Sequence, residues 1–122
     1  LGPGDIAVVA APAFQIPNDA VMLPGASTMS VPLGNDTPFL ERIERVLLEL
    51  NPKPKTIILN YPHNPTALTV EPSFFEKVVA LADKHQVSIM HDFAYGETCF
   101  DGYKAPSFLS ADGAKEFGCE CT

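Results

Sequence analysis

The sequence predicts an α/β fold, with a mostly parallel sheet and helices on both of its faces. Short apolar runs alternate along the chain with segments of helical periodicity, the order typical of strand–helix–strand units. The run at residues 5–10 is nearly continuously apolar, as expected for a strand buried on both faces of a sheet.

Five strands are expected. They are residues 5–10, 26–33, 56–60, 87–91 and 116–122. The first follows a Pro-Gly turn at Pro3 and Gly4, and the third and fourth are short β-branched and aliphatic runs.

Three helices are expected between these strands, at residues 16–23, 38–50 and 72–85. In the second helix Thr37 is a capping residue, and Pro38 suits the first helical position. Its apolar side chains recur at the spacing of one buried stripe. They are Phe39, Leu40, Ile43, Val46, Leu47 and Leu50.

The composition excludes several classes of partner. The 122 residues include 8 basic and 15 acidic side chains, a net charge of −7. This charge disfavours nucleic acid and anionic membrane surfaces as partners. No apolar run approaches the roughly 20 residues of a membrane span, and the chain starts without a signal-peptide pattern.

The cysteines and histidines indicate neither a disulfide framework nor a metal site. Cys99, Cys119 and Cys121 are odd in number, which favours free thiols in a reducing cytoplasm. The three histidines are scattered along the chain, so no metal site is expected. Because the chain opens at Leu1 and closes without a polar tail, we expect residues 1–122 to be one central piece of a longer protein.

Candidate functional residues follow the expected strands. Phe14, Asn64, Asp92 and Tyr95 all come shortly after an apolar run. The carboxyl ends of parallel strands share one edge of a sheet, where ligands bind. An Asp can keep a ring nitrogen protonated, Asn and Tyr can hydrogen-bond a ring oxygen, and an aromatic ring can stack on a flat ligand. This set fits a phenolic, nitrogen-containing ring.

Two motifs carry a family resemblance. Asn-Pro-Thr-Ala at residues 64–67 and His-Asp-Phe-Ala-Tyr at residues 91–95 resemble those of the class I/II pyridoxal-phosphate aminotransferases of the aspartate-aminotransferase fold. The similarity covers nearly the whole chain. Residues 74–82 are similar to the bacterial alanine and LL-diaminopimelate aminotransferase branch.

The resemblance implies a cofactor and roles for four residues. The cofactor is pyridoxal 5'-phosphate, held in the large domain of which this chain would be a central part. Asp92 would pair with the pyridine nitrogen, Asn64 and Tyr95 would hydrogen-bond the phenolic oxygen, and Phe14 would stack on the ring. The implied substrates are an amino acid and a 2-oxo acid, of the alanine/glutamate or LL-diaminopimelate type. The implied parent is a cytoplasmic homodimer.

The resemblance also makes two predictions about this chain. Cis peptide bonds are expected at Asn64–Pro65 and Ala11–Pro12. The lysine that forms the Schiff base in the family lies outside the chain, because none of its six lysines falls in the corresponding motif. The chain alone is therefore expected to be inactive and to self-associate through its sheet edges.

Other interpretations of the same residues are open. Taken singly, Asp92 is typical of a cap, Asn64–Pro65 of a turn, and Tyr95 and Phe14 of core aromatics. One alternative function is a non-catalytic α/β module that self-associates. Another is a small metal hydrolase that uses His63, His91 and Asp92.

Overall fold

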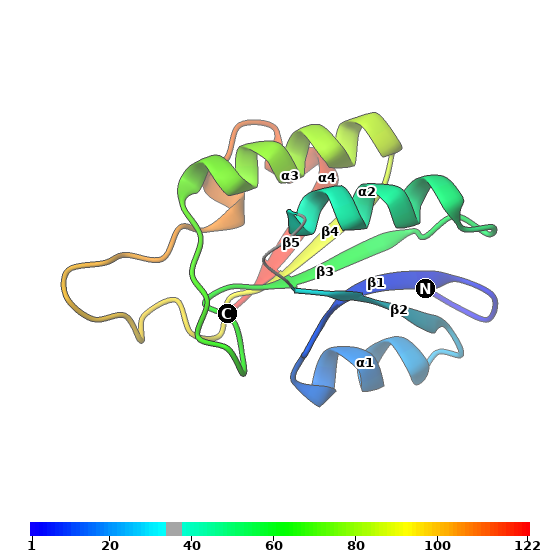
Figure 1. The fold of residues 1–122 in the computed structure, drawn as a ribbon, viewed down its shortest axis with the longest axis horizontal. Helices are drawn as coiled ribbons and strands as arrows, with labels where there is room; N and C mark the ends of the chain where they lie inside the picture. The colour runs from blue at the N-terminus through cyan, green and yellow to red at the C-terminus, as the bar shows by residue number, and fades with distance from the viewer. Residues whose placement is uncertain (34–37) are drawn as a thin grey trace. The chain divides into compact units, whose positions relative to one another are not determined.

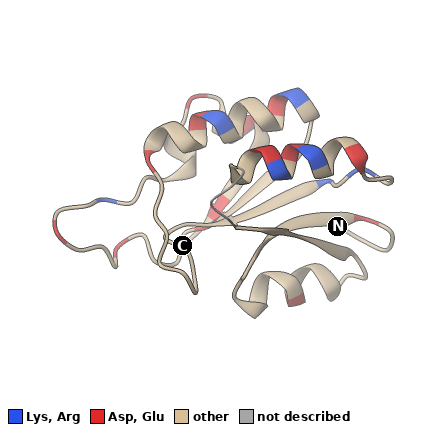
Figure 2. Cartoon of the chain, viewed as in Figure 1, with Lys and Arg blue, Asp and Glu red and all other residues tan. Residues whose placement is uncertain are grey.

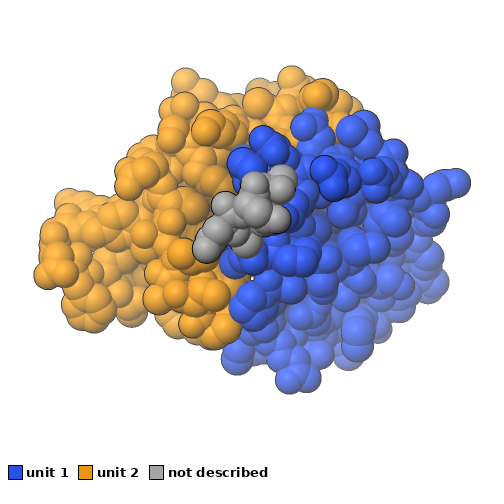
Figure 3. All heavy atoms as spheres, viewed as in Figure 1, with its two compact units in different colours: residues 1–58 blue, residues 59–122 orange. Residues whose placement is uncertain are grey.

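A computed structural model describes residues 1–33 and 38–122. The chain divides into two compact units, residues 1–58 and residues 59–122 (Figure 3). The elements are β1 (Ile6–Ala11), α1 (Gln15–Met22), β2 (Ser27–Pro32), α2 (Phe39–Glu49), β3 (Thr56–Asn60), α3 (Pro72–His85), β4 (Ser88–Asp92), the 3₁₀ turn η1 (Phe108–Ser110), α4 (Ala114–Phe117) and β5 (Gly118–Cys121).

The strands form a parallel sheet with the order β2-β1-β3-β4-β5. β1 pairs with β2 from Ile6↔Ser27 onward and with β3 from Ala7↔Thr56 onward, and both pairings are parallel. β4 and β5 also pair in parallel. The predicted α/β fold class with a mostly parallel sheet is therefore confirmed.

In the first unit, β1 is the centre of the core. Ala7 and Val8 of β1 are completely buried, because α1 and α2 lie on opposite faces of the strands of this unit (Figure 1). α2 turns Ile43 and Leu47 inward, and its acidic and basic residues lie along the rest of the helix (Figure 2). This amphipathic pattern is what the periodicity of residues 38–50 predicts.

In the second unit, α3 covers the strands through Phe75, which is 1% exposed. The Phe75 ring contacts the rings of His91 on β4 and Phe108 in η1. α3 begins at Pro72, where the missing N–H costs no hydrogen bond, and is capped by Gln86 in the left-handed conformation. α3, β4 and η1 thus pack around one aromatic cluster.

Most element boundaries agree with the sequence predictions. β3 and α3 have the predicted bounds, and the other strands and helices of residues 1–92 start and end within a residue of the prediction. The strand predicted from residue 116 starts only at Gly118, because Ala114–Phe117 form α4. The predicted cap Thr37 lies outside the described residues.

Two backbone predictions are confirmed. The peptide bonds Ala11–Pro12 and Asn64–Pro65 are both cis, as are Asn51–Pro52 and Tyr61–Pro62. Within the described ranges, no helix is both long and apolar enough to cross a membrane.

Candidate functional site

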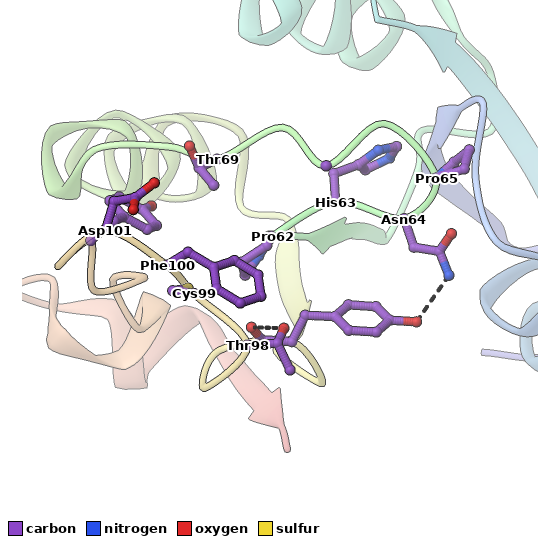
Figure 4. Close-up of a pocket in the computed structure, with 12 residues that line it drawn as sticks. Pro62, His63, Asn64, Pro65, Thr69, Thr98, Cys99, Phe100 and Asp101 are labelled. Carbon is purple, nitrogen blue, oxygen red and sulfur yellow. Dashed lines mark hydrogen bonds between the residues drawn. The ribbon is translucent and has the colours of Figure 1, made fainter.

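The site is built on two loops of the second unit, one after β3 and one after β4. Asn64 lies in the first loop and Tyr95 in the second. The Asn64 side-chain Nδ2 donates a hydrogen bond to the Tyr95 hydroxyl oxygen at 2.9 Å (Figure 4). Because the hydroxyl oxygen accepts from Asn64, its own proton and the second Asn64 N–H are available to a ligand. The pair can therefore offer two donors to one oxygen.

Asn60, the last residue of β3, links this pair to Asp92. Its Oδ1 accepts a hydrogen bond from the Asn64 backbone N–H at 2.8 Å. Its Nδ2 donates to the Asp92 carbonyl oxygen at 3.0 Å. One amide side chain thus connects the turn that holds Asn64 with the end of β4. The structure brings Asn64, Tyr95 and Asp92 into a single hydrogen-bonded network.

Asp92 closes β4 with a half-buried carboxylate. Its Oδ1 accepts from the Ala94 N–H at 3.3 Å, a long bond that leaves most of the carboxylate's capacity for other donors. The backbone beside it is held by β5, since the Phe93 N–H donates to the Cys121 carbonyl oxygen at 2.7 Å. Asp92 is therefore a fixed acceptor at the end of the strand.

A cavity of about 770 Å³ opens beside the Asn64–Tyr95 pair. Figure 4 shows it between the loop that carries His63 and Asn64 and the loop that carries Thr98 and Phe100. Its lining consists of Pro62, His63, Asn64, Pro65, Ala67, Thr69, Tyr95, Thr98, Cys99, Phe100, Asp101 and Tyr103. The lining includes Asn64 and Tyr95 but not Asp92, so the carboxylate lies outside the cavity wall.

His63 stiffens the turn before Asn64. Its ring Nδ1 is hydrogen-bonded to the Thr66 hydroxyl at 2.8 Å, and its backbone pairs with Ala67 and Leu68. The side chain is buried, and burial lowers the pKa of the imidazole. A neutral His63 with an internal partner is a structural residue.

Phe14 belongs to the first unit and is the N-cap residue of α1. Its ring is 46% exposed, so a flat surface is available at the start of the helix. The predicted stacking role of Phe14 stays a prediction.

The described residues provide no ligand set for the metal-hydrolase alternative. Both ring nitrogens of His91 already have protein partners, Glu120 and the Tyr61 carbonyl oxygen. In residues 1–33 and 38–122, no three His, Cys, Asp or Glu side chains are grouped to hold a metal ion. The three cysteines are free, and burial together with Cys119 and Asp92 raises the pKa of Cys121.

Comparison with known proteins identifies the family. The model of the aminotransferase class I and II family matches residues 1–117. The chain belongs to the class I and II aminotransferases.

Three relatives illustrate the similarity. The chain is 44% identical to the glutamate-pyruvate aminotransferase AlaC of Escherichia coli K12, over 96% of the chain and 28% of the relative. It is 42% identical to the LL-diaminopimelate aminotransferase of Dehalococcoides mccartyi strain BAV1, over 98% of the chain and 31% of the relative. The apo structure of BacF from Bacillus subtilis matches with a TM-score of 0.85 at 36% identity, over 98% of the chain and 32% of that structure.

The chain therefore spans about 30% of the length of the aminotransferases that it matches. Sequence reasoning missed Asn60, which links the Asn64 turn to Asp92. Its signal was its position, as a polar residue at the carboxyl end of a buried strand.

Proposed function

We propose that residues 1–122 are a central part of the large domain of a pyridoxal-phosphate-dependent aminotransferase, and that this part holds the cofactor's ring. The observation that carries the proposal is the network that joins Asp92, Asn60, Asn64 and Tyr95 in a chain of this family. It combines a carboxylate acceptor with two donors that are free to bind one oxygen, and this set suits a protonated pyridine that carries a phenolic oxygen.

Each side chain has a separate task in this proposal. The Asp92 carboxylate holds a proton at the pyridine nitrogen by charge pairing. Asn64 and Tyr95 donate to the phenolic oxygen, and Phe14 stacks on the ring face. When bound, pyridoxal phosphate supplies an electron sink for bond cleavage at the substrate's α-carbon, which the protonated nitrogen strengthens.

The proposed substrates of the whole enzyme are an amino acid and a 2-oxo acid. The names of the two relatives support an alanine/glutamate or an LL-diaminopimelate reaction. Comparing turnover with L-alanine, L-glutamate and LL-diaminopimelate as amino donors separates these reactions.

We also propose that the whole enzyme is a cytoplasmic homodimer and that this chain alone self-associates. The free thiols of Cys99, Cys119 and Cys121 fit a reducing compartment. Exposed apolar side chains at Ile16 and Leu23 in the first unit provide surface for association.

The test of the proposed function is Asp92→Asn in the full-length enzyme. Loss of a charged hydrogen bond of about 1.5–3 kcal/mol corresponds to a fall of about 10- to 150-fold in kcat/KM. Asp112→Asn, on an exposed turn, is the matched control and should keep full activity. Full activity in Asp92→Asn, or no transamination by the unmodified full-length enzyme, would reject the proposal.

A further inference from the structure

His91 is a completely buried imidazole whose two nitrogens both face hydrogen-bond acceptors. Its Nε2 lies 3.1 Å from the Tyr61 carbonyl oxygen, and its Nδ1 lies 2.9 Å from Oε2 of Glu120. A carbonyl oxygen only accepts, so Nε2 carries a hydrogen. A second proton must then lie between Nδ1 and the carboxyl group of Glu120. It belongs either to an imidazolium facing a carboxylate or to a carboxylic acid facing a neutral imidazole.

The surroundings of Glu120 favour the carboxylate. Its side chain is 9% exposed, and it accepts hydrogen bonds from the Ser107 hydroxyl and from the Phe108 N–H at 2.8 Å. Two donors other than His91 are therefore directed at this carboxyl group, and hydrogen bonds of this kind are strongest when the acceptor carries a charge.

The charges around the His91 ring favour the imidazolium. The charged groups acting on it are Glu120 from β5 and Asp92 from its own strand, and both are negative. α3 presents the uncharged Phe75 ring to it, and the Phe93 ring also contacts it, with the ring centroids 5.1 Å apart. Burial is the largest influence on His91 and lowers its pKa below the ordinary value, and the Glu120 hydrogen bond and the two negative charges oppose this shift only in part. The geometry still requires a proton between Nδ1 and Oε2, because without one two acceptors would face each other at 2.9 Å.

We propose that His91 and Glu120 form a buried ion pair that positions Asp92 for the cofactor's ring nitrogen. This inference rests on the proposed function of Asp92. In the strand register His91 lies opposite Glu120, and Asp92 lies opposite Cys121. Through Tyr61 and Glu120, the imidazole ties the loop after β3 and strand β5 to β4 directly before Asp92. A displacement of His91 therefore moves Asp92, and the imidazolium places a positive charge near the Asp92 carboxylate.

The first test locates the protons and is independent of activity. Neutron diffraction from crystals of the full-length enzyme in heavy water should show deuterium on both ring nitrogens of His91. A bare Nδ1 with deuterium on Oε2 of Glu120 would overturn the ion pair, whatever the enzyme's reaction is.

The second test uses Glu120→Gln in the full-length enzyme loaded with pyridoxal phosphate. We expect kcat to fall about 10- to 100-fold with little change in KM. A displaced Asp92 would affect the chemical step at the cofactor's ring rather than substrate binding. Glu76→Gln on the exposed surface of α3 is the matched control and should behave as the unmodified enzyme. An unchanged kcat in Glu120→Gln would overturn the proposal.

The double variant His91→Gln/Glu120→Gln distinguishes two roles of the pair. One is the positioning of Asp92 beside a positive charge, and the other is a purely structural contribution to stability. Removing one partner leaves a buried charge unpaired, so each single variant should lower Tm, and the neutral pair should regain much of it. We expect kcat to stay low in the double variant, because the positive charge next to Asp92 is gone. Recovery of both Tm and kcat would show that the pair is only structural. Full activity in Asp92→Asn would instead reject the proposed function and leave the neutron result standing.

Discussion

A single neutral imidazole, that of His63, supports the turn that presents Asn64. Its folded-state pKa is lowered by burial, whereas in the unfolded chain it titrates near its ordinary value of about 6.5. The unfolded state therefore binds a proton more readily than the folded state. The stabilisation is present above the unfolded pKa and is lost as the pH falls below it.

We therefore expect the free energy of unfolding to fall as the pH is lowered from about 7 to about 5, by at most about 1.4 kcal/mol per pH unit from this group. Urea unfolding at several pH values measures the slope. His63→Gln should flatten it, whereas Thr66→Val removes the ring's partner but keeps the titrating imidazole and should not. An identical pH dependence in His63→Gln would contradict this account.

At the scale of elements, the approach of β5 to β4 depends on Gly118. This residue has an extended backbone with φ of −168°, so its role is one of space rather than of conformation. A Cβ at this position would collide with the carbonyl oxygen of Ile89 on β4, a backbone atom that cannot turn away. Any larger residue must push the two strands apart.

Gly118→Ala is therefore expected to destabilise the chain by about 1–3 kcal/mol, the usual cost of forcing extra volume into a packed site. Because the shift separates His91 from Glu120, it should also lower the activity of the full-length enzyme. Chemical unfolding measures the first effect. Gly2→Ala, where a Cβ would meet nothing within 4 Å, is the control and should be nearly neutral. Equal stability of the two variants would be evidence against the strand contact.

The elements with strong local signals are the ones that the sequence predicts correctly. β3 and α3 have the predicted bounds because a β-branched run, Pro72 and an apolar stripe mark them directly. α4 is a single turn at Ala114–Phe117, too short for any periodicity, so the strand predicted at residues 116–122 includes its last two residues.

The residues of the candidate site also fall into two groups, those that a local motif marks and those that only long-range contacts define. Asn64, Asp92 and Tyr95 follow strands within short motifs, so the sequence alone points to them. Asn60 and Glu120 act through partners 32 and 29 residues away in the chain. Such contacts depend on how strands pair, and neither spacing nor composition predicts them.

For the whole molecule, the positions of the lysine side chains determine whether this chain can bind the cofactor covalently by itself. The chain has six lysines, and all of them lie in its described part. Lys77 and Lys84 lie on α3, and Lys55 forms an ion pair with Asp5 at 2.8 Å. None of the six lines the cavity beside Asn64 and Tyr95. Covalent capture of an aldehyde cofactor and proton transfer at the substrate carbon both require an amine at that place.

The chain alone should therefore bind pyridoxal phosphate weakly and reversibly, and it should not transaminate. Mixing it with the cofactor, L-alanine and a 2-oxo acid, followed by borohydride reduction and mass spectrometry, tests this expectation. The full-length enzyme is the positive control and should yield one modified lysine and many turnovers. The same result from residues 1–122 alone would show that one of the six lysines reaches the cofactor, and that the network around Asp92 is sufficient for catalysis.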